Sequence, residues 1–207
     1  MKQLGAVIVD PADVPNFDKF GPTEMEVLHY EFKADLNKYL KALPEDARVH
    51  SMEELIRFNE ENSDRVMPYF GQERMTTAQA KGSLREKKYK DALAKNLRLT
   101  RKEGIDAAMR KHKLDVIVVP SGGPAWMIDL VNGDGINWDM ESTSPPAVAG
   151  YPHITVPAGH VFGLPVGISF IGKAWQEASL IQYAYAFEQA TQYRRQPRYL
   201  STASLNP

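Results

Sequence analysis

The chain has 207 residues, of which 43% are hydrophobic and 25% charged, proportions typical of a globular domain with a sizeable core. Its 25 Lys and Arg residues nearly balance 26 Asp and Glu residues, and the net charge of -1 argues against nucleic acid or an anionic membrane as the main partner. The absence of cysteine excludes disulfides, zinc-thiolate sites and a cysteine nucleophile, and it is compatible with a cytoplasmic location.

The N-terminal apolar run, "GAVIVD" at residues 5–10, is too short for a secretory signal, and no stretch approaches the length of a membrane span. Small and β-branched residues without polar alternation predict a β-strand that is buried on both faces and closed by Pro11. Little chain precedes this strand to cover it.

The next segment predicts a helix that ends before Pro44. Thr23 and Glu26 form a capping-box pattern at its start. Apolar residues then recur at helical spacing and define the expected inner face: Met25, Leu28, Phe32, Leu36, Tyr39, Leu40 and Leu43.

Two more helices are predicted before residue 112. Ser51 and Glu54 repeat the capping box at the start of a shorter helix. After a loop, a long basic helix is expected from about Thr77 to Lys111, with Gly82 and Gly104 as weak points.

The rest of the chain alternates strands and helices, which is typical of an α/β fold. Strands are predicted at 114–120, 153–157 and 166–172, and helices at 144–150 and 177–194. The segment 149–172 carries no charged residue, as expected for strands covered on both faces.

A hydrolase needs an activated nucleophile, and two serines are candidates. The pattern G-x-S-x-G around Ser169 fails because Ile171 replaces the second glycine, so Ser169 is interpreted as a small core residue with local hydrogen bonds. Ser121 follows a strand, where α/β proteins place ligands, but a serine without a neighbouring base is more often a turn residue.

Metal and cofactor sites are not predicted. The five histidines form no H-x-x-x-H pair, and His153 and His160 only bracket one strand. Part of a calcium-loop pattern is present in four residues: Asn132, Asp134, Gly135 and Glu141. Leu130 occupies the first position of that pattern, which requires an oxygen ligand, so a solvated acidic loop is favoured over a calcium site.

Four aromatic residues fall in predicted loops: Tyr69, Phe70, Trp126 and Trp138. They indicate either a pocket wall or packing between surface loops.

Three segments together resemble the C-terminal part of amidase signature enzymes, a family that includes amidases and the A subunit of the glutaminyl-tRNA-forming amidotransferase. They are "DVIVVPSGGPAW" (115–126), "SPPAVAGYPHITVPAGHVFGLPVGISFIG" (144–172) and "ASLIQYAYAFEQA" (178–190). Because "SMEELIRFNEEN" (51–62) and "MPYFGQE" (67–73) are also similar to family segments, the resemblance spans nearly the whole chain.

The resemblance implies an α/β fold with a mixed sheet flanked by helices, in a single domain over residues 1–207. The family's serine nucleophile, second serine in a cis peptide and lysine belong to an earlier region, and nothing in this sequence matches them. No catalytic residue is therefore assigned. The resemblance implies five pocket-wall residues: Tyr69, Phe70, Gln72, Trp126 and Ile128.

The leading hypothesis is the scaffold and pocket-wall portion of a hydrolase of linear carboxamide C–N bonds, inactive alone. Its expected partners are an N-terminal amidase region and, in the intact enzyme, a small-molecule amide. An uncovered sheet edge also predicts self-association. The alternatives are a non-enzymatic binding or assembly protein on an amidase scaffold and, more weakly, a calcium-binding module.

Overall fold

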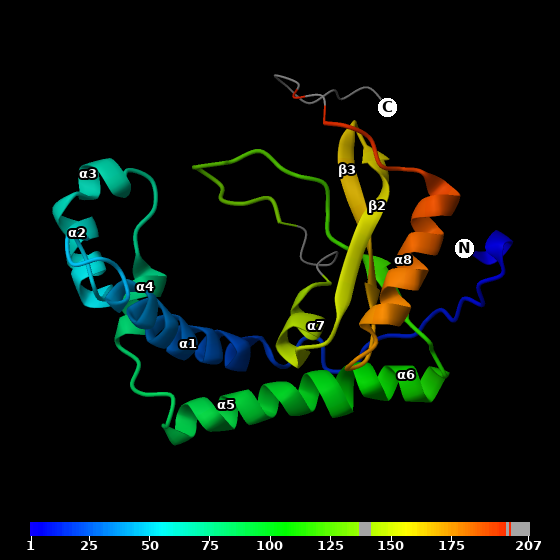
Figure 1. Ribbon diagram of the computed structural model, residues 1–207, viewed down its shortest axis with the longest axis horizontal. Helices are drawn as coiled ribbons and strands as arrows, with labels where there is room; N and C mark the ends of the chain where they lie inside the picture. Colours follow the sequence, from blue (N-terminus) through cyan, green and yellow to red (C-terminus); the bar gives the residue numbers. More distant parts are fainter. Residues whose placement is uncertain (137–141, 198, 200–207) are drawn as a thin grey trace. The chain divides into compact units, whose positions relative to one another are not determined.

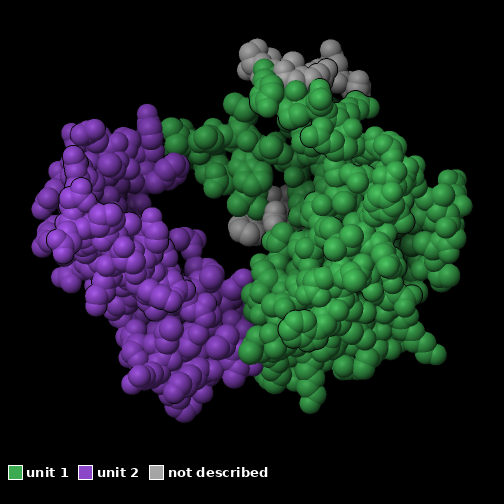
Figure 2. All heavy atoms as spheres, in the orientation of Figure 1, with its two compact units in different colours: residues 1–17, 97–207 green, residues 18–96 purple. Residues whose placement is uncertain are grey.

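The structure is a computed structural model that describes residues 1–136, 142–197 and 199. The chain forms two compact units, one of residues 18–96 and one of residues 1–17 with 97–207 (Figure 2). Each unit has its own hydrophobic cluster of buried side chains. Whether the two units behave as the expected single domain stays a prediction.

The unit of residues 18–96 is helical. It contains α1 (Gly21–Lys41), α2 (Met52–Glu61), α3 (Ser63–Val66), α4 (Glu73–Gln79) and most of α5 (Lys87–Leu97). The packed core joins α1 to α5 through Val27, Tyr30, Tyr89 and Ala92. The Lys33 Nζ donates to the carbonyl oxygens of Gln79 (2.7 Å) and Lys81 (2.6 Å), which satisfies carbonyls at the end of α4.

The inner face of α1 differs from the predicted one. The buried residues are Val27, Tyr30 and Leu40, whereas Leu28, Phe32 and Tyr39 are exposed. Thr23 does not cap the helix: its hydroxyl donates to the Phe20 carbonyl (2.9 Å), inside a helix that already began at Gly21. The capping box at α2 is confirmed, since Ser51 Oγ accepts from the Glu54 N–H at 3.1 Å.

The predicted helix from Thr77 to Lys111 is replaced by shorter pieces. After α4 the chain runs through a loop, and helix resumes as α5, the π-helical segment η2 (Arg98–Ile105) and α6 (Asp106–His112). Gly104 has non-helical backbone angles, with φ -115° and ψ -108°. A Cβ at Gly104 would lie 2.5 Å from the Leu99 carbonyl oxygen, so the wide turn requires glycine there.

The other unit contains a three-stranded antiparallel sheet in the order β1-β3-β2. The strands are β1 (Ile117–Pro120), β2 (His153–Val161) and β3 (Leu164–Ile171). A two-residue turn joins β2 to β3, and both Phe162 (φ 48°) and Gly163 (φ 77°) adopt the positive φ that tight hairpins require. The predicted α/β fold with a helix-flanked sheet is confirmed, and both described ladders are antiparallel.

Helices cover both faces of this sheet (Figure 1). Successive residues of a strand point to opposite faces, so Phe170 and Ile171 belong to different clusters. Phe170 packs with Leu180 and Ala184 of α8 (Glu177–Thr191). Ile171 packs with residues of η2, α6 and α7 (Ser144–Ala149), namely Ile105, Ala108, Met109 and Ala149.

The predicted strand at 5–10 does not form. A short helix, η1 (Lys2–Leu4), begins the chain, and residues 6–9 that follow have no strand partner within the described residues. Val7 is 91% exposed. The apolar composition is that of a strand, but a strand also needs a neighbour with which to exchange hydrogen bonds.

Candidate functional site

Three hydroxyl groups meet on one face of the sheet, one contributed by or beside each strand. Ser121 follows β1, and its N–H donates to the Gly167 carbonyl of β3 at 3.0 Å. Ser121 Oγ lies 2.8 Å from Ser169 Oγ on β3 and 3.3 Å from Thr155 Oγ1 on β2. Thr155 Oγ1 and Ser169 Oγ are 2.9 Å apart, which closes a triangle, hereafter the hydroxyl cluster.

Gly167 makes room for this cluster. A Cβ at that position would lie 2.7 Å from Ser121 Oγ and 2.7 Å from Thr155 Cγ2, both closer than atoms normally pack. The prediction that Ser169 is a core residue with local hydrogen bonds is confirmed, because it is fully buried and bonded to both partners.

Within residues 1–136, 142–197 and 199, no base bonds to the hydroxyl cluster. The hydrogen bonds of Ser121, Thr155 and Ser169 side chains within the described residues join them only to one another. A serine nucleophile needs a neighbouring group that takes its proton. These hydroxyls therefore hold the three strands together, and nothing in the described part of the chain activates Ser121.

The five sequence-predicted wall residues fall in the two separate units. Tyr69 and Phe70 are 71% and 68% exposed in the helical unit. Gln72 is half-buried and links α4 to α2: its Nε2 donates to the Ile56 carbonyl (3.0 Å), and its Oε1 accepts from Asn59 (3.1 Å). Gln72 thus has a structural role in addition to the predicted one.

Trp126 and Ile128 lie in the loop after β1, in the other unit, and Ile128 is 80% exposed. Gly135 packs against Trp126, since a Cβ there would lie 3.4 Å from the Trp126 Cβ. Whether these two residues and the three of the helical unit line one pocket stays a prediction. Trp138 lies outside the described residues.

The Asp129 carboxylate forms the turn of this loop. It accepts from the backbone N–H groups of Val131 (2.9 Å) and Asn132 (2.8 Å) and from Asn132 Nδ2 (2.8 Å). These hydrogen bonds, that of the Asn132 N–H first, hold the pKa of Asp129 below its usual range. The carboxylate oxygens are thus engaged within the loop.

No cluster of three or more His, Cys, Asp or Glu side chains suitable for a metal occurs in residues 1–136, 142–197 and 199. Glu141, the last position of the incomplete calcium pattern, lies outside these residues. His153 begins β2, and burial lowers the pKa of its imidazole, which favours the neutral form. In the described part of the chain, no helix combines the length and apolarity required to span a bilayer.

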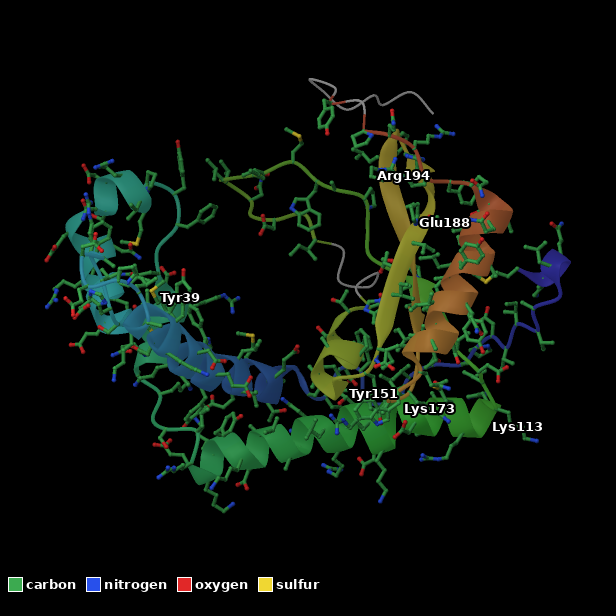
Figure 3. The ribbon with its side chains drawn as sticks, in the orientation of Figure 1. Tyr39, Lys113, Tyr151, Lys173, Glu188 and Arg194 are labelled. Carbon is green, nitrogen blue, oxygen red and sulfur yellow. The ribbon has the colours of Figure 1, made fainter. Side chains whose placement is uncertain are left out.

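A polar cluster that the sequence did not indicate joins the end of α7 to η2 and α6, and its Tyr151 is labelled in Figure 3. Arg101 Nε donates to the Ala149 carbonyl at 2.6 Å, and its guanidinium lies 5.6 Å from the centre of the Tyr151 ring. The Tyr151 hydroxyl donates to Asp106 at 3.0 Å. Burial, and then this hydrogen bond, raises the pKa of Tyr151.

A large apolar hollow of about 1040 Å³ adjoins β1. Its wall comes from the N-terminal segment, β1, β3 and α8, and it is almost entirely aliphatic or aromatic. Residues that define it include Val7, Val9, Val118, Phe170, Tyr183 and Phe187. The hollow belongs wholly to the unit that carries the sheet.

Comparison with known proteins identifies the family. The sequence profile described as Amidase matches residues 1–181. The chain belongs to the amidase family. It is 36% identical over 207 residues to a protein of Arabidopsis thaliana named "Probable amidase", a match that covers 97% of this chain and 36% of that protein.

Solved amidases show the same fold. A peptide amidase in complex with the competitive inhibitor chymostatin is 43% identical, with a TM-score of 0.88 over 96% of this chain and 39% of its own. The native peptide amidase of Stenotrophomonas maltophilia is 41% identical, with a TM-score of 0.80 over 91% of this chain and 37% of its own.

The amidotransferase part of the resemblance is also supported. The A subunit of the glutamyl-tRNA(Gln) amidotransferase of Geobacillus kaustophilus is 42% identical over 88 residues, which are 41% of this chain and 18% of that protein. This chain spans little more than a third of the length of the amidases that it matches end to end.

Proposed function

We propose that this chain is the C-terminal scaffold and pocket-wall portion of an amidase-type hydrolase of linear carboxamide C–N bonds. The observation that carries the proposal is its similarity to peptide amidases, at 41% to 43% identity and TM-scores of 0.80 and 0.88, combined with coverage of only 37% to 39% of those enzymes. Carboxamides at the end of peptides are therefore the first substrates to test.

In the assembled enzyme, a serine outside this chain attacks the amide carbonyl, and ammonia or an amine leaves as an acyl-enzyme forms. Water then releases the acid. The hydroxyl cluster supports this assignment of roles, because among the described residues the Ser121 side chain bonds only to other hydroxyl groups. Tyr69, Phe70, Gln72, Trp126 and Ile128 form part of the substrate-pocket wall in this proposal, and the cytoplasm is its expected location.

The test is amide hydrolysis by the purified chain together with labelling by a serine-directed fluorophosphonate. We expect ammonia release from a peptide amide to stay at the uncatalysed rate and no serine to be labelled. Efficient labelling at Ser121, abolished in Ser121→Ala, would show that the chain carries its own nucleophile.

A second candidate is a non-enzymatic binding or assembly protein. The apolar hollow of about 1040 Å³ favours it, since an apolar pocket can hold a ligand without reacting with it. Stabilisation of the chain by a carboxamide, measured as a rise in melting temperature without turnover, would support this function. The candidate is abandoned if amides leave the melting temperature unchanged.

A further inference from the structure

A second hollow, hereafter the lysine pocket, lies wholly inside the helical unit. It has a volume of about 630 Å³, which is within the range of pockets that bind small molecules. Its wall comes from α1, α4, the loop at 80–86 and the start of α5. Most of the lining side chains are polar, in contrast to those of the hollow beside β1, and the full set is Tyr30, Thr76, Thr77, Ala80, Lys81, Gly82, Glu86 and Lys88.

Two ammonium groups converge in this wall. Lys81 Nζ lies 3.0 and 2.9 Å from the two carboxylate oxygens of Glu26, and Lys88 Nζ lies 2.8 Å from the first of them. Because both lysines bind one carboxylate, their charges are held close together. The Lys81 side chain is only 16% exposed, so its charge is weakly screened by water.

Glu26 orients the two lysines but does not exhaust them. It is not among the residues that line the pocket. An ammonium group has three N–H donors, and Glu26 accepts at most two from Lys81 and one from Lys88. The Lys88 side chain is 67% exposed, so a ligand in the pocket can reach its remaining N–H groups.

A hydroxyl group completes the set of donors. Thr77 lines the pocket, and within residues 1–136, 142–197 and 199 its side chain forms no hydrogen bond. The neighbouring Thr76 hydroxyl is engaged, since it donates to the Gln72 carbonyl at 3.3 Å. Thr77 therefore offers a donor that the protein itself leaves unused in the described part of the chain.

The acidic residue of the wall is held aside. Glu86 accepts from the Tyr30 hydroxyl at 2.6 Å, and its carboxylate lies over Gly82, where a Cβ would overlap it. Residues 81–91 carry five Lys or Arg side chains and two acidic ones, and the excess stays positive when Glu26 is included. A hollow with spare donors and excess positive charge attracts an anion.

We propose that the lysine pocket binds the phosphate group of a small phosphorylated molecule, with Lys81, Lys88 and the Thr77 hydroxyl as its ligands. A phosphate monoester carries about two negative charges near neutral pH and three strong acceptor oxygens. It therefore matches two ammonium groups and a hydroxyl better than a carboxylate, which has one charge and two oxygens. The inference goes beyond the proposed function, because none of the five expected wall residues of the amide pocket lines the lysine pocket.

The test titrates the full chain with inorganic phosphate at neutral pH and follows its backbone amides by two-dimensional NMR. Chloride keeps the ionic strength constant, so that general screening does not change during the titration. We expect saturable shifts at Thr77, Lys81, Gly82 and Lys88 with a common dissociation constant of about 1 mM. The β2–β3 hairpin, which belongs to the other unit, should not shift.

A matched pair of lysine variants separates the pocket from general attraction to a basic surface. Lys88→Gln removes one ammonium group and should weaken phosphate binding at least about fivefold. Its fold is expected to persist, because Lys81 still pairs with Glu26. Lys90→Gln removes the same charge from the same helix at a residue that does not line the pocket, and it should change the affinity by less than about twofold.

A threonine pair tests the hydroxyl group. Thr77→Val keeps the shape of the side chain, removes the donor and should weaken phosphate binding about threefold. Thr77→Ser keeps a hydroxyl group and should bind phosphate as the native chain does.

Several results would overturn the inference. They are the absence of saturable shifts in the pocket, an equal loss of affinity in Lys88→Gln and Lys90→Gln, and unchanged binding by Thr77→Val. Acetate that binds as tightly as phosphate would assign the pocket to carboxylates instead. Amide turnover plays no part in these measurements, so a failure of the proposed function leaves their result unchanged.

Discussion

Gly167→Ala tests whether the hydroxyl cluster holds the sheet together. The new methyl would lie 2.7 Å from both Ser121 Oγ and Thr155 Cγ2 and 3.1 Å from Ser121 Cβ. Crowding of this kind costs about 1–3 kcal/mol. Displacement of Ser121 Oγ weakens its bond to Ser169, a loss of about 1 kcal/mol. Alanine also makes the unfolded chain less flexible than glycine does, which raises the free energy of unfolding by about 0.5–1 kcal/mol.

The net expectation is a loss of about 1–3 kcal/mol in the free energy of unfolding. Urea unfolding followed by circular dichroism measures it. Gly21→Ala is the control: nothing lies within 4 Å of its new Cβ, so it should lose no stability and gain up to about 1 kcal/mol. Adding Ser121→Ala to Gly167→Ala removes one crowded atom and should recover part of the loss. The account would be refuted if Gly167→Ala were as stable as the native chain. It would also be refuted if the loss of stability in the double variant equalled the sum of the losses in Gly167→Ala and Ser121→Ala.

Three further predictions concern helix capping and titration. Ser51→Ala should cost about 1 kcal/mol in urea unfolding because Ser51 caps α2, whereas Thr23→Ala, which removes no cap, should cost less; equal losses would contradict the assigned caps. Hydrogen bonds to carboxylates raise the pKa of Tyr30 and of Tyr89 to about 12, so the stability that they contribute is complete below pH 10 and disappears as the pH rises from 10 to 12. Ultraviolet absorbance of tyrosinate during alkaline unfolding measures this. Tyr30→Phe and Tyr89→Phe should each remove one tyrosine that titrates near pH 12. The pKa of Asp129 is depressed, so its charged carboxylate stabilises the turn at neutral pH and this stabilisation is lost as the pH falls below the ordinary carboxyl range. Titration of the carboxyl group followed by NMR should show a pKa below the usual Asp value. A pKa at the usual value would contradict the hydrogen bonds of the turn.

The C-terminal half of the fold could be predicted because its signals are local. Apolar runs on either side of Gly163 predict the two hairpin strands, and Gly150 ends α7 in the left-handed conformation that glycine favours. The predicted end of the first strand at Pro157 was wrong, because β2 continues to Val161 with a shift in register between Pro157 and Gly159. The helix at 177–194 was also correct to within a few residues, as α8 ends at Thr191.

The errors arose where a partner distant in sequence decides the outcome. Residues 5–10 have strand composition but no neighbouring strand, and the burial of α1 follows its contacts with α4 and α5 rather than its most apolar face. The hydroxyl cluster could not be predicted either, because Ser121 and Ser169 are 48 residues apart and meet only through the register of β1 and β3. Gly167 is the one local signal, but its role in making room for Ser121 can be recognised only once the register of β1 and β3 is known.

The wide turn of η2 has a consequence for how the chain tolerates changes in length. A π-helical turn accommodates one more residue than an α-helical turn, so the face presented by α6 is offset from the face that a regular helix from the start of η2 would present. A regular α-helix over the same residues would rotate α6 by about 100° relative to the start of η2, because each residue adds that angle. Ala108 and Met109 would then swing away from Ile171. One extra residue thus sets which side chains reach the sheet, and a further insertion here should be far less tolerated than in the loop at 80–86.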